Sequence, residues 1–177
     1  MTIIAYKDGV LAADKAEYQY SIVTGNRRKV YKHSTGLTTY GWAFSGTSAE
    51  IAIVHDLLQT ILARRPDREQ PHKFKFSEEE AEAWKSTVQG MELFAGVLVV
   101  SRVGFDKPCL YALSNTPYAL SITSDEYAIG AESPVIAARA AMMAGVDAAR
   151  AVEIACKLTN MAQMGDIRSD VQFEIIT

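Results

Sequence analysis

Apolar residues in this chain follow two different spacings, and the order in which these spacings occur restricts the fold more than any other feature of the sequence. Short apolar runs separated by turn residues are typical of strands, whereas apolar residues that recur every three or four positions indicate amphipathic helices. Both patterns occur here, in separate blocks. In chain order we expect strands within 2–44, helices at 47–65 and 77–89, strands within 94–122, helices at 133–143 and 147–158, and a strand at 171–175.

Local signals mark where several of these elements begin and turn. Two Ser/Thr-x-x-Glu capping boxes, starting at Thr47 and Ser77, predict the starts of the first two helices. The dipeptides Asp8-Gly9 and Gly25-Asn26 each predict a tight hairpin turn, because such turns need positive φ angles. We therefore predict that residues 2–44 form two hairpins followed by a further strand.

Strands grouped in blocks, rather than alternating strictly with helices, favour antiparallel sheets. Two pairs of amphipathic helices then need apolar surfaces to cover. Two packed, mainly antiparallel sheets between helix pairs meet both requirements. We therefore predict the α+β class, as a four-layer αββα sandwich formed by a single domain over residues 1–177.

Charge and composition argue against several classes of function. A formal net charge of -3 provides no positive field for nucleic acid. No stretch reaches the roughly 18 apolar residues that a membrane-spanning helix needs, and Lys7 and Asp8 stand where a secretory signal would be apolar. Cys109 and Cys156 show no metal-ligand spacing, and no phosphate-binding glycine loop occurs. We expect a cytoplasmic protein without metal or cofactor that binds neither nucleic acid nor membrane.

Thr2 directly follows Met1 and precedes an apolar strand. Removal of Met1 is favoured by the small neighbouring side chain, and it would leave a residue with both a hydroxyl and a free α-amine. A threonine hydroxyl is a weak nucleophile until a base removes its proton, and an α-amine, with a free pKa of about 8, can be that base. Thr2 is thus a candidate nucleophile, although a start with no function is the alternative.

Asp14 and Lys29 are candidate partners for this nucleophile. Asp14 ends the apolar strand VLAAD, and the hairpin register returns that end towards Thr2. Strand alternation predicts that Lys29 and Val30 point to opposite faces. An inward lysine beside Asp14 would hold a positive field over the amine and the hydroxyl. The alternatives are a solvent-exposed aspartate at a strand end and a solvated basic hairpin.

Gly46 lies in the segment FSGTSAE, just before the first expected helix. If Thr47 caps that helix, the Gly46 N–H lies at the helix N-terminus, where backbone donors and the dipole favour developing negative charge. Gly46 could then donate to an oxyanion. The alternative is that it only forms the tight turn between strand and helix.

Taken in order, these features resemble the proteasome β-subunit and HslV-type peptidase family of N-terminal-nucleophile (Ntn) hydrolases. The resemblance is carried over nearly the whole chain by Thr2 and by the segments DGVLAAD, GNRRKVYK, FSGTSAE, AIGAESPVIAARAAMMAG and DAARAVEIACKL. It implies the αββα fold of Ntn hydrolases, with a homo-oligomer of stacked hexameric or heptameric rings. It also implies polypeptide substrates and allows for a separate AAA+ unfoldase as a partner.

The resemblance further implies roles for five residues. Thr2 would be the nucleophile, Asp14 and Lys29 would orient and tune it, and Gly46 would donate to the oxyanion. Phe44 would shape the pocket for the substrate side chain. The predicted function is that of a threonine-type endopeptidase subunit of a self-compartmentalising ring protease. Two alternatives stay open, namely a non-catalytic structural ring subunit of the same fold and an Ntn amidase that acts on a small amide.

Two positions depart from the family pattern. Ala131 stands where the family commonly has a serine that supports the threonine amine. Near the C-terminus, Asp166 and Asp170 both match an aspartate that the family often places beside the site. The chain therefore has no hydroxyl at position 131 to support the amine of Thr2, and Asp166 and Asp170 stay open as alternatives for the aspartate.

Overall fold

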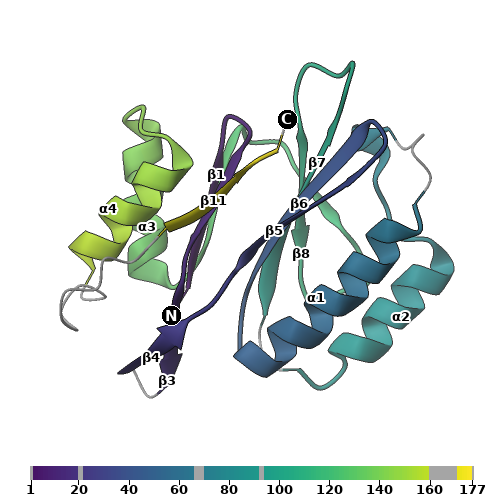
Figure 1. The fold of residues 1–177 in the computed structure, drawn as a ribbon, viewed down its shortest axis with the longest axis horizontal. Coiled ribbons are helices and arrows are strands. Elements are labelled where there is room, and N and C mark those ends of the chain that lie inside the picture. The colour runs from purple at the N-terminus through teal and green to yellow at the C-terminus, as the bar shows by residue number, and fades with distance from the viewer. Residues whose placement is uncertain (1, 20–21, 66–69, 92–93, 160–170, 177) are drawn as a thin grey trace. The chain divides into compact units, whose positions relative to one another are not determined.

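A computed structural model describes residues 2–19, 22–65, 70–91, 94–159 and 171–176. The chain divides into two compact units (Figure 1). The first unit comprises Met1–Tyr31 and Ser124–Ile175, and the second comprises Lys32–Thr123 and Ile176–Thr177. Each unit is described by itself below. The prediction of a single domain over residues 1–177 is not tested by this division.

The first unit contains a four-stranded antiparallel sheet with the strand order β10-β1-β2-β11. The Asp8-Gly9 turn joins its two central strands, and both turn residues have positive φ angles, 49° and 81°. The predicted first hairpin is therefore confirmed. The strands are β1 (Ile3–Lys7), β2 (Val10–Asp14), β10 (Glu126–Gly130) and β11 (Val171–Ile175).

Two helices, α3 (Glu132–Met143) and α4 (Ala148–Leu158), cover one face of this sheet (Figure 1). The buried side of α4 consists mainly of alanines, and α3 contributes Ala138 and Met142 to the same apolar cluster. Small side chains let the two helices lie close to each other and to the sheet. Asp147 begins α4 by accepting a hydrogen bond from the Arg150 N–H at 2.8 Å, as the sequence predicts.

A separate two-stranded sheet pairs β3 (Ala16–Gln19) with β4 (Ile22–Asn26). The second predicted hairpin, with its turn at Gly25-Asn26, is wrong, because both residues lie in β4 and pair with β3. Glycine can adopt a positive φ angle but does not require one, and here the pairing of β4 with β3 sets the backbone conformation of Gly25 and Asn26. The base of this hairpin is closed by the Arg27 N–H, which donates to the Lys15 carbonyl at 2.7 Å.

The second unit contains a five-stranded sheet in the order β5-β6-β7-β8-β9, with the pairs from β6 to β9 antiparallel. Helices α1 and α2 lie side by side along this sheet (Figure 1). The elements are β5 (Val30–Thr35), β6 (Thr38–Ser45), α1 (Ser48–Ala63), a 3-10 helix η1 (Pro71–Lys73), α2 (Glu78–Val88), β7 (Ala95–Arg102), β8 (Cys109–Leu113) and β9 (Leu120–Ile122).

Aromatic side chains join the helices of the second unit to its sheet. Trp84 of α2 is fully buried, lies against Phe44 and Phe94, and donates its indole N–H to the Ser114 carbonyl at 2.9 Å. Both predicted capping residues, Thr47 and Ser77, accept hydrogen bonds from the N–H groups three residues later. The predicted starts of α1 and α2 are therefore confirmed.

The predicted α+β class, with antiparallel sheets and a helix pair on each main sheet, is confirmed. The sequence prediction missed β10, whose residues Glu126–Gly130 form an edge strand with partly exposed side chains. Such a strand lacks the apolar alternation by which a half-buried strand is predicted. Among the described residues, no helix has the length and apolar character needed to cross a bilayer.

Cys109, at the start of β8, provides a prediction about pH. It is partly buried, and burial raises the pKa of its thiol because the thiolate loses solvation. We therefore expect iodoacetamide to alkylate Cys109 more slowly at neutral pH than it alkylates a small free thiol. The rate should keep rising at alkaline pH after the rate of the free thiol has levelled off. Peptide mapping of timed samples measures this, with urea-unfolded protein as the control, and a rate that follows the free thiol at every pH would contradict it.

Candidate active site

The β1–β2 hairpin brings Asp14 to the start of the chain. The antiparallel register pairs Ile4 with Ala13, so Asp14, the last residue of β2, lies opposite Ile3. Its Oδ1 accepts a hydrogen bond from the Ile3 N–H at 2.8 Å. The carboxylate is thereby held beside the residue that follows Thr2, as the sequence predicts.

Lys29 lies at the centre of a buried polar cluster. Its Nζ donates to Oδ2 of Asp14 at 2.8 Å, to the carbonyl of Ala16 at 2.7 Å and to Oγ1 of Thr2 at 3.2 Å. A lysine ammonium has three N–H donors, and these contacts supply an acceptor for each of them. The geometry points the positive charge of Lys29 at the hydroxyl of Thr2.

All three side chains are withdrawn from solvent. Thr2 is 8% exposed, Asp14 0% and Lys29 6%. The alternatives of an exposed strand-end aspartate and a solvated basic hairpin are therefore excluded for Asp14 and Lys29. Burying two charges costs solvation that a single ion pair rarely recovers fully, so such pairs call for an explanation beyond stability.

The carbonyl of Thr2 is fixed by the segment that links β10 to α3. The Ala131 N–H donates to the Thr2 carbonyl at 3.0 Å. Gly130, with a φ of 134°, lies so close that a Cβ atom built on it would be 1.9 Å from the same carbonyl oxygen. Thr2 is thus held by its side chain on one side and by its backbone on the other.

The structure brings together three of the five residues that the sequence singled out, Thr2, Asp14 and Lys29. Gly46 and Phe44 belong to the second unit, and their predicted roles are not tested there. The Phe44 side chain is 0% exposed and packs against aromatic rings, so within its unit it is a core residue. Asp166 and Asp170 lie outside the described residues.

The strand prediction for Lys29 was wrong, although the residue reaches the site. Lys29 precedes β5, in irregular backbone rather than in a strand, and the side chains of both Lys29 and Val30 are buried. The β3–β4 hairpin explains its position, since β3 starts at Ala16, whose carbonyl binds Lys29, and β4 ends three residues before Lys29. Sequence reasoning missed Ala16 and Gly130, because their contribution is made by the backbone.

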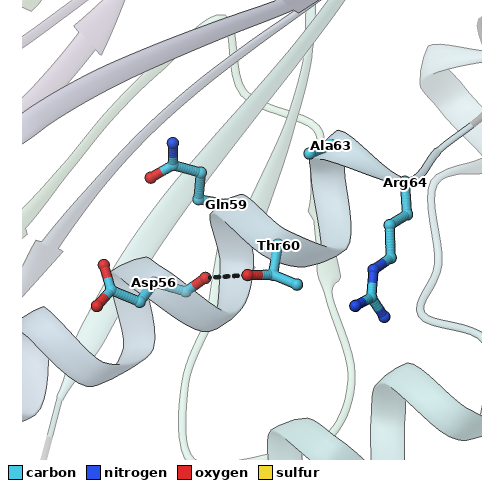
Figure 2. A pocket seen from close by; sticks show the side chains of 5 residues that line it. All are labelled: Asp56, Gln59, Thr60, Ala63 and Arg64. Carbon is cyan, nitrogen blue, oxygen red and sulfur yellow. Dashed lines mark hydrogen bonds between the residues drawn. The ribbon is translucent and has the colours of Figure 1, made fainter.

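A surface depression follows the exposed side of α1 in the second unit. Asp56, Gln59, Thr60, Ala63 and Arg64 line it, and the Thr60 hydroxyl donates to the Asp56 carbonyl at 2.8 Å (Figure 2). None of the predicted site residues takes part. The described residues also contain no group of three or more His, Cys, Asp or Glu side chains arranged to hold a metal ion.

Solved structures with the same fold include proteins named Anbu. One, described as an ancestral beta-subunit, comes from Yersinia bercovieri and matches with 14% sequence identity and a TM-score of 0.63, over 98% of this chain and 81% of that chain. A Gly-1 mutant of Anbu from Hyphomicrobium sp. strain MC1 matches with 13% identity and a TM-score of 0.66, over 98% of this chain and 80% of that chain. The Anbu complex from Pseudomonas aeruginosa, described as a helical assembly, matches with 14% identity and a TM-score of 0.62, over 99% and 80%.

These matches correct the family suggested by the sequence. The resemblance to proteasome β-subunits and HslV-type peptidases pointed to the wrong family, because the matching structures are Anbu proteins, which are proteasome-like but distinct. The shared architecture is the proteasome-type Ntn fold. No protein-family model and no curated protein matches the sequence. At this level of identity the likeness concerns the fold alone.

Proposed function

We propose that this chain is a peptidase subunit in which Thr2, once it is N-terminal, attacks the carbonyl carbon of a peptide bond. The single observation that carries the proposal is the buried contact between the Thr2 hydroxyl and the ammonium of Lys29, which is itself paired with Asp14. An oxygen that must become negatively charged is favoured by a fixed positive charge in a site with little water.

We assign a different task to each of the three residues, and their contacts support this assignment. Lys29 cannot accept the proton of Thr2, because its three N–H groups already act as donors, so it stabilises the developing alkoxide instead. Asp14 fixes the direction of the ammonium. The base is then the α-amine of Thr2, which exists only after Met1 has been removed, because until then that nitrogen belongs to the Met1–Thr2 peptide bond.

The reaction follows from these tasks. Oγ1 of Thr2 forms a bond to the substrate carbonyl carbon while its proton passes to the α-amine. The amine then gives this proton to the leaving nitrogen, the peptide bond breaks, and an ester between substrate and Thr2 remains. Water, deprotonated by the same amine, hydrolyses the ester and frees the hydroxyl. Gly46 remains the predicted donor to the oxyanion.

The proposal includes an assembly of identical copies in the cytoplasm that degrades polypeptides. The helical assembly described for the Anbu complex of Pseudomonas aeruginosa supports the association of copies. Because no phosphate-binding glycine loop occurs in the sequence, any use of ATP would fall to a separate AAA+ unfoldase.

Replacing Thr2 with valine tests the nucleophile. Valine keeps the shape of threonine without its hydroxyl, so we expect hydrolysis of fluorogenic peptides to fall to background while the fold is retained. Thr2→Ser keeps a hydroxyl and should keep measurable activity. Turnover is compared between untagged chains that begin at Thr2 and untagged chains that begin at Met1. Intact-mass spectrometry verifies the first residue of each chain. A panel of small amides is assayed alongside the peptides.

Three outcomes would contradict the proposal. The first is retained turnover in the Thr2→Val variant. The second is turnover by the form that keeps Met1, because the base would be missing. The third is a chain that begins at Thr2 and cleaves no peptide. If such a chain cleaves small amides, it is an amidase. If it cleaves neither, it is a structural subunit.

A further inference from the structure

Lys29 reaches Thr2 from a part of the backbone that belongs to no strand. β4 ends at Asn26 and β5 begins at Val30, so residues 27–29 lie between two strands. In a strand, the pairing with neighbouring strands fixes the face to which each side chain points. Other contacts therefore have to fix the direction in which the side chain of Lys29 leaves the backbone.

The side chain of the preceding residue, Arg28, makes such contacts. Its Nε donates to the carbonyl of Val30 at 2.9 Å, so it spans Lys29 to reach the residue that follows. Its Nη2 donates to Oε1 of Glu174 in β11 at 3.2 Å. The guanidinium thus ties the backbone around Lys29 to β11, which lies at one edge of the four-stranded sheet.

Tyr31 supports the same arrangement. Its hydroxyl donates to the carbonyl of Arg28 at 2.8 Å, and Cζ of Arg28 lies 5.4 Å from the centroid of its ring. A guanidinium at this distance over an aromatic face is attracted to the ring. The carbonyl before Lys29 and the carbonyl of the residue after it therefore each accept a hydrogen bond from this pair of side chains.

The contact between Lys29 and Thr2 is the one that a small displacement would break first. Nζ of Lys29 lies 3.2 Å from Oγ1 of Thr2, but 2.8 Å from Oδ2 of Asp14 and 2.7 Å from the carbonyl of Ala16. If the backbone at Lys29 shifts, the ammonium can keep its two shorter hydrogen bonds and lose the longest. Pairing with Asp14 alone therefore does not explain why the ammonium faces the hydroxyl.

We propose that Arg28 is a positioning residue that, with Tyr31 and Glu174, directs the ammonium of Lys29 at the hydroxyl of Thr2. The inference rests on the proposed function, in which that ammonium stabilises the developing alkoxide. The side chain of Arg28 is 56% exposed, and an ion pair so exposed contributes little to stability. The effect of Arg28 should therefore appear in the rate of the reaction rather than in the stability of the fold.

Steady-state kinetics of the Arg28→Met variant test the proposal, with a fluorogenic peptide and untagged protein that begins at Thr2. We expect kcat to fall by about tenfold with KM nearly unchanged, less than the roughly 100-fold cost of a 1 Å misplacement because Asp14 still holds Lys29. The midpoint of urea unfolding should change little. Tyr31→Phe keeps the ring and removes only the hydroxyl, so it should lower kcat by a smaller factor.

Arg150→Met is the matched control. The side chain of Arg150 is also 56% exposed and is paired with a glutamate, Glu153, but that pair lies within a single helix, α4. The same replacement there removes an equally exposed ion pair without touching the backbone around Lys29. We expect kcat and KM of this variant to equal those of the natural chain.

Chemical labelling reports the position of Lys29 without relying on catalysis. An acetylating ester that reacts with uncharged amines should modify Lys29 slowly, because its side chain is buried and paired with Asp14. In the Arg28→Met variant, local opening should make this labelling several-fold faster. Peptide mapping after cleavage at glutamates measures the rate, and the exposed Lys157 on α4 is the internal reference, which should react equally in both proteins.

Three outcomes would overturn the proposal. They are an unchanged kcat in Arg28→Met, an equal fall in kcat in Arg150→Met, and a fall in kcat without faster labelling of Lys29, because Arg28 would then act by another route. Failure of the proposed function looks different. If the natural chain cleaves no peptide but Arg28→Met still exposes Lys29 to labelling, the peptidase proposal fails while the positioning of Lys29 by Arg28 stands.

Discussion

Replacing Lys29 with methionine is expected to lower peptide hydrolysis by about 10²–10³-fold, the usual cost of removing one fixed donor that stabilises developing negative charge. Methionine keeps most of the length and apolar character of the lysine side chain but offers no donor to Thr2. The hydroxyl would then have to develop negative charge without a neighbouring ammonium. Initial rates with a fluorogenic peptide measure the loss.

The same substitution is expected to lower the free energy of unfolding by about 3–5 kcal/mol, because it leaves the carboxylate of Asp14 buried without its partner. Urea unfolding followed by circular dichroism measures this change. Lys32→Met is the matched control, since Lys32 lies three residues further along and is exposed. We expect that variant to keep both its stability and its activity.

Removing both charges separates the two effects. In the double variant with Asp14→Asn and Lys29→Met, no uncompensated charge remains, so the loss of stability should be smaller than the sum of the two single losses. Activity should stay lost, because the hydroxyl of Thr2 still lacks the ammonium. A double variant that regains stability and hydrolysis together would show that Lys29 acts only through folding.

The position of Asp14 could be predicted from the sequence because its causes are local. A two-residue Asp8-Gly9 turn fixes the register of β1 and β2, and that register alone decides what faces Ile3. The N-terminal ends of α1 and α2, at Thr47 and Ser77, could be predicted for a similar reason. Each cap depends only on residues within one helical turn.

The position of Lys29 could not be derived in the same way. It depends on the β3–β4 hairpin, whose turn was placed wrongly, and on the Ala16 carbonyl, a backbone group that any residue would supply. Gly130 was missed because Thr2, which it contacts, is more than a hundred residues away in the sequence, so no local sequence pattern indicates the contact. The family resemblance named the wrong family, and the roles that it implies for Thr2, Asp14 and Lys29 stay predictions, although the structure brings these three side chains together.

Gly130→Ala is expected to displace Thr2 and so to impair both folding and catalysis. The added Cβ would lie 1.9 Å from the Thr2 carbonyl oxygen, and the φ of 134° is strained for any residue with a side chain. Either β10 or the start of β1 must shift, which breaks the hydrogen bond from the Ala131 N–H. We expect a loss of about 3 kcal/mol or more in the free energy of unfolding, from backbone strain and overpacking together.

The effect on catalysis should appear in kcat more than in KM, because the displaced atom belongs to the nucleophilic residue and not to a surface that binds substrate. A shift of about 1 Å there is expected to lower kcat roughly 100-fold. Gly145→Ala is the matched control, since Gly145 also has a positive φ, 92°, but a Cβ built on it meets nothing within 4 Å. It should show the cost of backbone strain alone, with kcat unchanged. Equal losses of stability and equal kcat in the two variants would mean that close packing of Gly130 against Thr2 does not position the nucleophile.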